Sequence, residues 1–250
     1  MKIVAVVNRK GGVGKTATAH ALGAGLMRKG YSVLFIDLDS QTNLSYALGA
    51  NTDGLGSMDV LTGRATVPEA KQRTPQGDVL AGSAELSNAD QIITGTGKEY
   101  RLREALEGLH VLYDYIIIDT PAALGTLTIN ALTAASSALI PVQADIYSLQ
   151  GIGQLYETIE AVRKYCNKDL RVDGIIVTRY SARSVISRDM LANLEDAAQQ
   201  LSTRLYHVPV RECVSIKEAQ AQQQDIFTYA PRSNAAKDYG ALVEEFTERK

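Results

Sequence analysis

The sequence has few cysteines and no long apolar run. Cys166 and Cys213 lie far apart and form no C-x-x-C pair, so we predict neither a zinc site nor a disulfide framework and expect both to be buried or half-buried. No stretch of about 18 consecutive apolar residues occurs, which argues against a transmembrane helix. Met1 leads directly into an apolar run, leaving no room for a signal peptide, and we expect a cytoplasmic protein.

Strong overall charge is also lacking. The net charge is −2, which by itself gives no sign of nucleic-acid binding. Residues 163–217, however, contain ten Lys or Arg and six Asp or Glu, a local charge of +4. Such a region can hold phosphates through counterion release, although a solvated face without a partner has the same composition.

Short apolar runs alternate with helix-patterned segments along the chain. Near-continuous Val and Ile favour strands buried on both faces of a parallel sheet. The alternation predicts an α/β fold with a doubly wound, mainly parallel sheet flanked by helices, in a single domain over residues 1–250. The expected strands are 3–7, 32–36, 78–80, 115–118, 138–142, 172–177 and 205–208, and the expected helices are 16–29, 98–110, 125–135, 149–166, 187–203 and 233–248, with 50–76 the most irregular stretch.

A glycine-rich loop follows the first apolar run. Residues 8–18 read Asn-Arg-Lys-Gly-Gly-Val-Gly-Lys-Thr-Ala-Thr. A strand, such a loop and a helix form a phosphate cradle, in which backbone N–H groups and the helix N-terminus converge on oxyanions. We expect Lys15 to contact the β- and γ-phosphates and the Thr16 hydroxyl to bind Mg²⁺. The other expected nucleotide contacts in the loop are Gly11, Gly12, Val13, Gly14 and Ala17.

The loop departs from the usual G-x-x-x-x-G-K-[ST] pattern, since Arg9 stands at the first glycine and Lys10 follows it. Its K-G-G-x-G-K-T form resembles the deviant Walker A box of the ParA/MinD group of P-loop ATPases. The resemblance implies that Lys10 reaches the nucleotide bound by the partner subunit and acts there in catalysis with Lys15. A cation suits that place because negative charge accumulates near the γ-phosphate during transfer.

Two further strands end in acids. Asp37 and Asp39 are two residues apart, so they point to the same side of an extended chain, although an N-capping role is the alternative. Residues 37–43 resemble the family's D-x-D-P-Q-G-N box, with Ser40 replacing Pro and Thr42 replacing Gly. The resemblance implies that Asp39 orients the hydrolytic water and, like Asp37, belongs to the Mg²⁺ site. Asp119 looks like a Walker B acid that holds Mg²⁺ through water.

The resemblance extends over nearly the whole chain, through residues 123–132, 140–143, 174–183, 210–219, 228–233 and 235–239. The chain is identified as a member of the ParA/Soj-type partition ATPases. This implies a slow, Mg²⁺-dependent ATP hydrolase that forms an ATP-dependent homodimer on the nucleoid. A ParB-like centromere-binding protein would stimulate it, in segregation of a plasmid, chromosome or integrative element.

The resemblance also implies that the ATP-bound dimer binds DNA non-specifically through basic residues of the C-terminal half. Arg183 falls where the family places one such arginine, with a surface salt bridge as the alternative. Arg188, Arg211 and Lys217 are further candidates. Thr178 and Arg179 are candidates to contact adenine, and Arg179 is equally a candidate for DNA.

Other classes share parts of this pattern. A MinD-like membrane-cycling ATPase needs an amphipathic, basic C-terminal helix, whereas residues 242–250 contain three acids; we expect no membrane partner. An iron–sulfur carrier would need more suitably placed cysteines. A bacterial tyrosine kinase would show a tyrosine-rich tail, whereas the twelve tyrosines here are dispersed.

Overall fold

The computed structural model describes residues 1–181, 185–200 and 202–248, without the side chains of residues 146–150, 185–189 and 200. Over these residues the chain forms a seven-stranded sheet in the order β3-β4-β2-β5-β1-β6-β7. All neighbouring strands are parallel except the edge pair β3 and β4. The strands are β1 (Lys2–Val6), β2 (Val33–Asp37), β3 (Gln72–Thr74), β4 (Gly77–Leu80), β5 (Tyr115–Asp119), β6 (Ser137–Gln143) and β7 (Arg171–Thr178).

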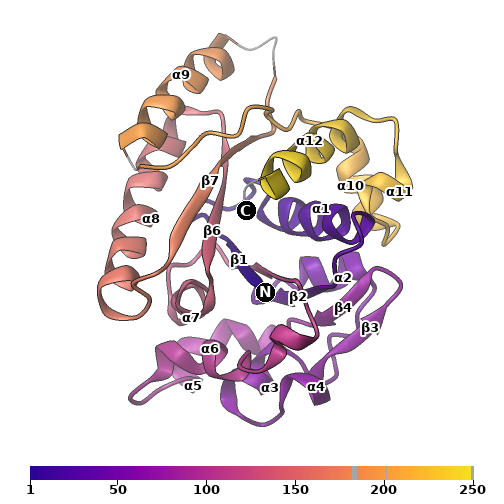
Figure 1. The fold of residues 1–250 in the computed structure, drawn as a ribbon, viewed down its shortest axis with the longest axis vertical. Helices are drawn as coiled ribbons and strands as arrows, with labels where there is room; N and C mark the ends of the chain where they lie inside the picture. Colours follow the sequence, from indigo (N-terminus) through magenta and orange to yellow (C-terminus); the bar gives the residue numbers. More distant parts are fainter. Residues whose placement is uncertain (182–184, 201, 249–250) are drawn as a thin grey trace.

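Helices cover both faces of the sheet (Figure 1). One face carries α1 (Lys15–Arg28), α2 (Asn43–Leu48), α10 (Val214–Ala221), α11 (Ile226–Tyr229) and α12 (Asn234–Glu248). The other carries α3 (Ser57–Thr62), α4 (Val67–Ala70), α5 (Ala89–Ile92), α6 (Arg101–Ala105), α7 (Thr126–Ala134), α8 (Ile146–Tyr165) and α9 (Val185–Gln200). The predicted doubly wound α/β class is therefore confirmed.

The central strand β5 shows why the sequence forms this sandwich. Ile116, Ile117 and Ile118 are all fully buried. Because side chains alternate across a strand, Ile116 and Ile118 face the core under α3–α9, whereas Ile117 faces the core under α1 and α12. Two apolar cores on one sheet require strands that are apolar on both faces.

Helix α1, which follows the glycine-rich loop, is packed closely against the sheet and against α12. A Cβ on Gly23 would lie 2.1 Å from Cε1 of Phe35, and one on Gly25 would lie 2.4 Å from Cγ2 of Val243. These two glycines therefore let the helix backbone approach both neighbours. This packing fixes the N-terminus of α1, where the phosphate cradle is expected.

Some expected elements differ from the structure. Residues 205–208 form no strand; Leu205 makes an isolated bridge to Ile175. The expected helix 98–110 is broken into α6 and two 3₁₀ turns, with Gly97 and Gly108 at positive φ. The irregular stretch 50–76 contains α3, α4 and β3. No helix among the described residues is long and apolar enough to cross a membrane.

Candidate nucleotide-binding site

The loop between β1 and α1 has the backbone conformation that its glycines permit. Gly12 has φ of 74° and Gly14 has φ of 83°, in the left-handed region that side chains disfavour. Gly14 is the N-cap of α1, whose first turn carries no acidic side chain. The positive end of the helix dipole thus faces the loop, as an anion site requires.

A cleft of about 720 Å³ opens beside this loop. Phosphate-loop residues line one end, and Tyr46 and α10 line another part. Of the predicted site residues, the cleft is lined by Gly11, Gly12, Gly14, Lys15, Thr16, Ala17, Asp39, Thr178, Arg179, Arg211 and Lys217. Val13 is fully buried, so it can offer a ligand only its backbone.

Lys15 and Thr16 begin α1 and point toward the acids of the sheet. The Thr16 hydroxyl donates a hydrogen bond of 2.6 Å to Asp119 Oδ2. Burial lowers the pKa of Lys15, while the charges of Asp119 and Asp39 oppose this shift. A bound polyphosphate would add further negative charge beside this buried lysine and would favour its charged form.

Asp119 and Asp37 end the neighbouring strands β5 and β2 and are paired in register. Both carboxylates are fully buried. Burial and the charge of Asp37 raise the pKa of Asp119 well above its usual value. Among the described side chains, Asp119 Oδ1 is one of three buried polar atoms without a hydrogen-bond partner. An orphaned carboxylate oxygen beside a threonine hydroxyl fits Mg²⁺, which prefers oxygen ligands.

The described residues contain no group of three or more His, Cys, Asp or Glu side chains that could hold a metal ion. Mg²⁺ is usually bound by one or two carboxylates together with substrate phosphates and water. Thr16 and Asp119 could hold such an ion together with a nucleotide in the cleft.

Asp37 is occupied by the loop that follows it. Its Oδ1 accepts the backbone N–H of Asp39 at 3.0 Å, and its Oδ2 accepts the N–H and the hydroxyl of Ser45 at 2.9 and 2.6 Å. Burial raises the pKa of Asp37, and these hydrogen bonds oppose the shift. Asp37 thereby positions the backbone of Asp39, which reaches the cleft.

Thr42, which stands at the family's glycine, keeps a glycine-like backbone. Its φ is 53° and its ψ is 25°. A β-branched residue in this left-handed region is strained. The loop that follows Asp39 therefore holds Thr42 in this conformation at a cost in backbone energy.

Lys10 does not line the cleft; its ammonium forms an ion pair with Asp145, directly before α8. Its backbone N–H donates to Asn8 Oδ1 at 2.9 Å. The amide of Asn8 in turn donates to the carbonyl of Pro141 at 2.7 Å. The side chain of Lys10 is therefore held by a contact within its own chain, at the carboxyl end of β6.

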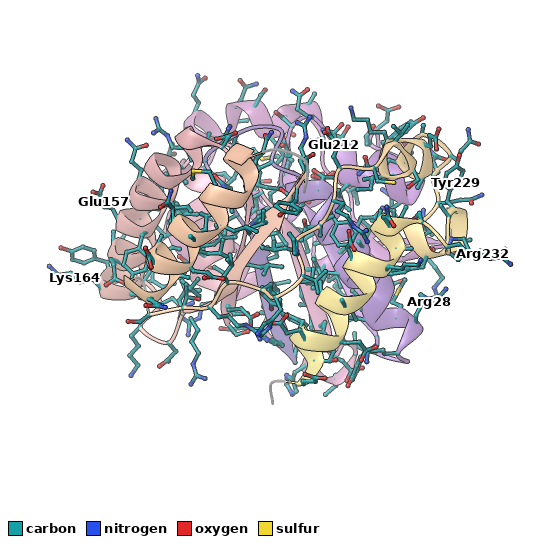
Figure 2. The ribbon with its side chains drawn as sticks, turned by 90° about the horizontal axis from the view of Figure 1, so that it is seen from above. Arg28, Glu157, Lys164, Glu212, Tyr229 and Arg232 are labelled. Atoms are coloured by element: carbon teal, nitrogen blue, oxygen red, sulfur yellow. The ribbon has the colours of Figure 1, made fainter. Side chains whose placement is uncertain are left out.

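The predicted adenine contacts lie at the end of β7. Thr178 is buried, and its hydroxyl donates to the carbonyls of Val13 and Val142 at 2.7 and 3.1 Å. Arg179 has φ of 50° and pairs with Glu212 at 2.9 Å. Figure 2 shows Glu212 on the segment before the C-terminal helices, with Lys164 and Arg232 on opposite flanks.

The candidate DNA-binding residues do not all share one environment. Arg211 is held by the buried Asp238 through contacts of 2.9 and 2.6 Å from Nε and Nη2. Lys217 is exposed at the edge of the same cleft. Arg183 and the side chain of Arg188 lie outside the described residues.

Sequence reasoning missed Ser45, Asp145 and Asp238, each of which holds a predicted site residue by a side-chain contact. Ser45 lies two residues beyond the acidic box, and Asp238 lies in a family-like string. Asp145 follows β6, and the carboxyl ends of parallel strands are where ligand sites form. Strand position was the available signal for Asp145.

The loop, the helix N-terminus and the paired acids define a P-loop nucleotide-binding protein. A family model described as an AAA domain matches residues 1–172. The sporulation initiation inhibitor protein Soj of Bacillus subtilis is 37% identical over 249 residues, covering 98% of this chain and 97% of that protein. The chromosome partitioning protein ParA of Caulobacter vibrioides is 35% identical over 256 residues, covering 100% and 95%.

A solved structure of cobyrinic acid a,c-diamide synthase from Mycobacterium smegmatis, with bound ATP analogue and magnesium, superposes with a TM-score of 0.85. It is 32% identical and covers 99% of this chain and 95% of that chain. The chain therefore belongs to the ParA/Soj family of P-loop ATPases.

Proposed function

We propose that this protein is a DNA-segregation switch that dimerises on ATP, binds DNA non-specifically and releases it on hydrolysis. Residues 1–250 would act as a single domain, in the cytoplasm and on the nucleoid. The single observation that carries the proposal is the convergence of Lys15, Thr16 and Asp39 on one cleft, with Asp119 behind them. This set supplies phosphate binding, metal binding and a candidate for orienting water.

The described residues fit ATP and Mg²⁺. Gly11, Gly12 and Gly14 would cradle the phosphates, and Lys15 would neutralise them. Thr16 and Asp119 would hold Mg²⁺, which when bound would offset negative charge on the phosphates. Asp37 would support the metal site through the hydrogen bonds that place Asp39. Asp39 would accept a hydrogen bond from the attacking water.

Dimerisation would bring Lys10 of each protomer to the nucleotide of the other. A cation there would stabilise the charge that develops as the γ-phosphate leaves. Loss of that phosphate would remove what the lysine binds, so hydrolysis would open the dimer. We propose that turnover is slow until a ParB-like centromere-binding protein stimulates it.

Two dimerised protomers would bind DNA more tightly than one, because linked sites gain avidity. We retain Arg183, Arg188 and the exposed Lys217 as DNA contacts. Arg211 forms an ion pair with Asp238, and Arg179 forms one with Glu212. These contacts favour a role for both arginines in binding the nucleotide base rather than DNA.

A MinD-like membrane cycle is the alternative, because the cell division ATPase MinD of Pyrococcus furiosus superposes with a TM-score of 0.80 at 26% identity, covering 100% of this chain and 99% of that chain. Here, however, the apolar face of α12 is already used. Tyr239, Leu242, Val243 and Phe246 are buried against α1 and the sheet. That face is not available to insert into lipid.

The experiment is DNA binding by the wild type and Arg183→Ala with ATP, ADP or no nucleotide. We expect tight DNA binding in the ATP state and not in the other two. Arg183→Ala should weaken this binding, and DNA affinity should fall steeply as the salt concentration rises. Equal affinity in the three nucleotide states would overturn the switch. Co-sedimentation with anionic liposomes rather than DNA would favour the membrane alternative.

A further inference from the structure

The ion pair between Lys10 and Asp145 joins two loops at the carboxyl ends of neighbouring strands. Lys10 follows β1 and Asp145 follows β6, and these strands are hydrogen-bonded in parallel. The backbone of Lys10 is tied to the same place through Asn8 and Pro141. Both the main chain and the side chain of the lysine are therefore held on its own subunit.

This arrangement conflicts with the task that the proposed function gives Lys10. One ammonium group cannot hold a carboxylate of its own subunit and also reach a nucleotide in the other. We propose that Asp145 is a latch that holds Lys10 on its own protomer and must release it before the dimer can close. The inference rests on the proposed ATP-dependent dimer.

The latch has the properties of a contact that can open. The side chains of Lys10 and Asp145 are 32% and 28% exposed, so water can solvate both charges after separation. A fully buried pair would instead leave an uncompensated charge. Asp145 also directly precedes α8, and a carboxylate is favoured at a helix N-terminus, so its charge stays stabilised when the lysine leaves.

The size of the effect follows from the exposure. A solvent-accessible ion pair shifts an equilibrium by about twofold to fivefold. Each dimer must open two latches, so together they would weaken dimerisation by about fourfold to 25-fold. The latch would thus set how much ATP-loaded protein is needed before dimers form.

The test is Asp145→Asn, measured by sedimentation velocity with a non-hydrolysable ATP analogue. Asparagine caps a helix as well as aspartate does, so the fold should be kept. We expect the dimer to form at about fourfold to 25-fold lower protein concentration, with no dimer in either protein without nucleotide. Raising the salt should shrink the difference, because screening weakens the wild-type pair.

Asp169→Asn removes the same charge from an exposed loop and should leave dimerisation unchanged. If Asp145→Asn folds poorly, as judged by melting temperature, Asp145→Ser takes its place.

The outcomes separate the latch from the proposed function. A wild type that stays monomeric with the analogue would overturn the dimer itself. A wild type that dimerises while Asp145→Asn dimerises equally or less well would overturn the latch and leave the dimer standing. An equal gain in Asp169→Asn would also overturn it, because the effect would then come from net charge alone.

Discussion

Thr16 donates a 2.6 Å hydrogen bond to Asp119 and so ties the first turn of α1 to the carboxyl end of β5. Two side chains that would bind Mg²⁺ are therefore adjacent in the fold. Preformed contacts of this kind lower the ordering cost of binding. The other carboxylate oxygen of Asp119 is buried without a hydrogen-bond partner, which costs free energy of folding.

Asp119→Asn should stabilise the nucleotide-free protein at neutral pH. The pKa of Asp119 is raised by burial, so its ionised form opposes folding. A raised pKa contributes stability that is present below the unfolded value of about 4 and lost as pH rises. We expect a gain on the order of 1 kcal/mol at pH 7 that vanishes toward pH 4, measured by urea unfolding. The variant should also lose the rise in melting temperature caused by Mg²⁺ with ATP. Lower stability than wild type at neutral pH would contradict this.

Thr42→Gly should stabilise the protein by about 1 kcal/mol, because glycine adopts positive φ without steric cost. Thermal unfolding of the nucleotide-free protein measures this. Thr62→Gly is the control, since Thr62 is the last residue of α3 and its hydroxyl donates to the carbonyl of Met58 at 2.8 Å, so that glycine there should destabilise the protein. Equal loss in both variants would show that Thr42 is not strained.

Arg211→Ala and Lys217→Ala should separate two roles. Asp238 holds the Arg211 side chain in the nucleotide cleft. Arg211→Ala should therefore weaken nucleotide affinity about tenfold, in line with the loss of one charge-assisted contact to the nucleotide. Lys217→Ala should keep nucleotide affinity and lower the salt slope of DNA binding by about one unit. Nucleotide titration and DNA binding at several salt concentrations measure the two effects. If Arg211→Ala changed only DNA binding and Lys217→Ala changed only nucleotide affinity, the two assigned roles would be contradicted.

Asp173→Asn should destabilise the fold by about 3 kcal/mol without changing nucleotide affinity. The carboxylate of Asp173 is buried and bonded to Lys2 at 3.0 Å, to Arg204 at 3.2 Å and to Tyr206. Burial acts to raise the pKa of Asp173, but these partners together lower it. A lowered pKa gives stability that is present above the unfolded value near 4 and lost in more acidic solution. The difference in unfolding free energy between the wild type and Asp173→Asn should therefore shrink below pH 4. A loss of nucleotide affinity at unchanged stability would contradict this.

The sequence sufficed to predict the parts of the fold that depend on local pattern. Continuous apolar runs such as 116–118 predicted central strands, and the glycine-rich loop marked the connection between β1 and α1. The sequence did not predict the short helices α2, α3, α4, α5, α10 and α11, because a few residues carry too little periodicity and their stability comes from packing.

Sequence motifs named candidate site residues, whereas residues that meet these candidates only through long-range contacts were missed. Lys15, Thr16 and Asp119 are within motifs, and the structure brings them together. Asp145 meets Lys10 across 135 positions of sequence, which no local pattern reveals. The left-handed backbone of Thr42 was hidden as well, because its residue type argues against the conformation that the fold imposes.

In the proposed dimer, the Lys10 side chain of each protomer reaches the nucleotide bound by the other. The direct measurement is the mass of the wild type and of Lys10→Ala by sedimentation velocity, each with a non-hydrolysable ATP analogue and Mg²⁺. We expect a wild-type dimer and a folded, nucleotide-binding Lys10→Ala monomer. A Lys10→Ala protein that dimerises as well as the wild type would contradict it.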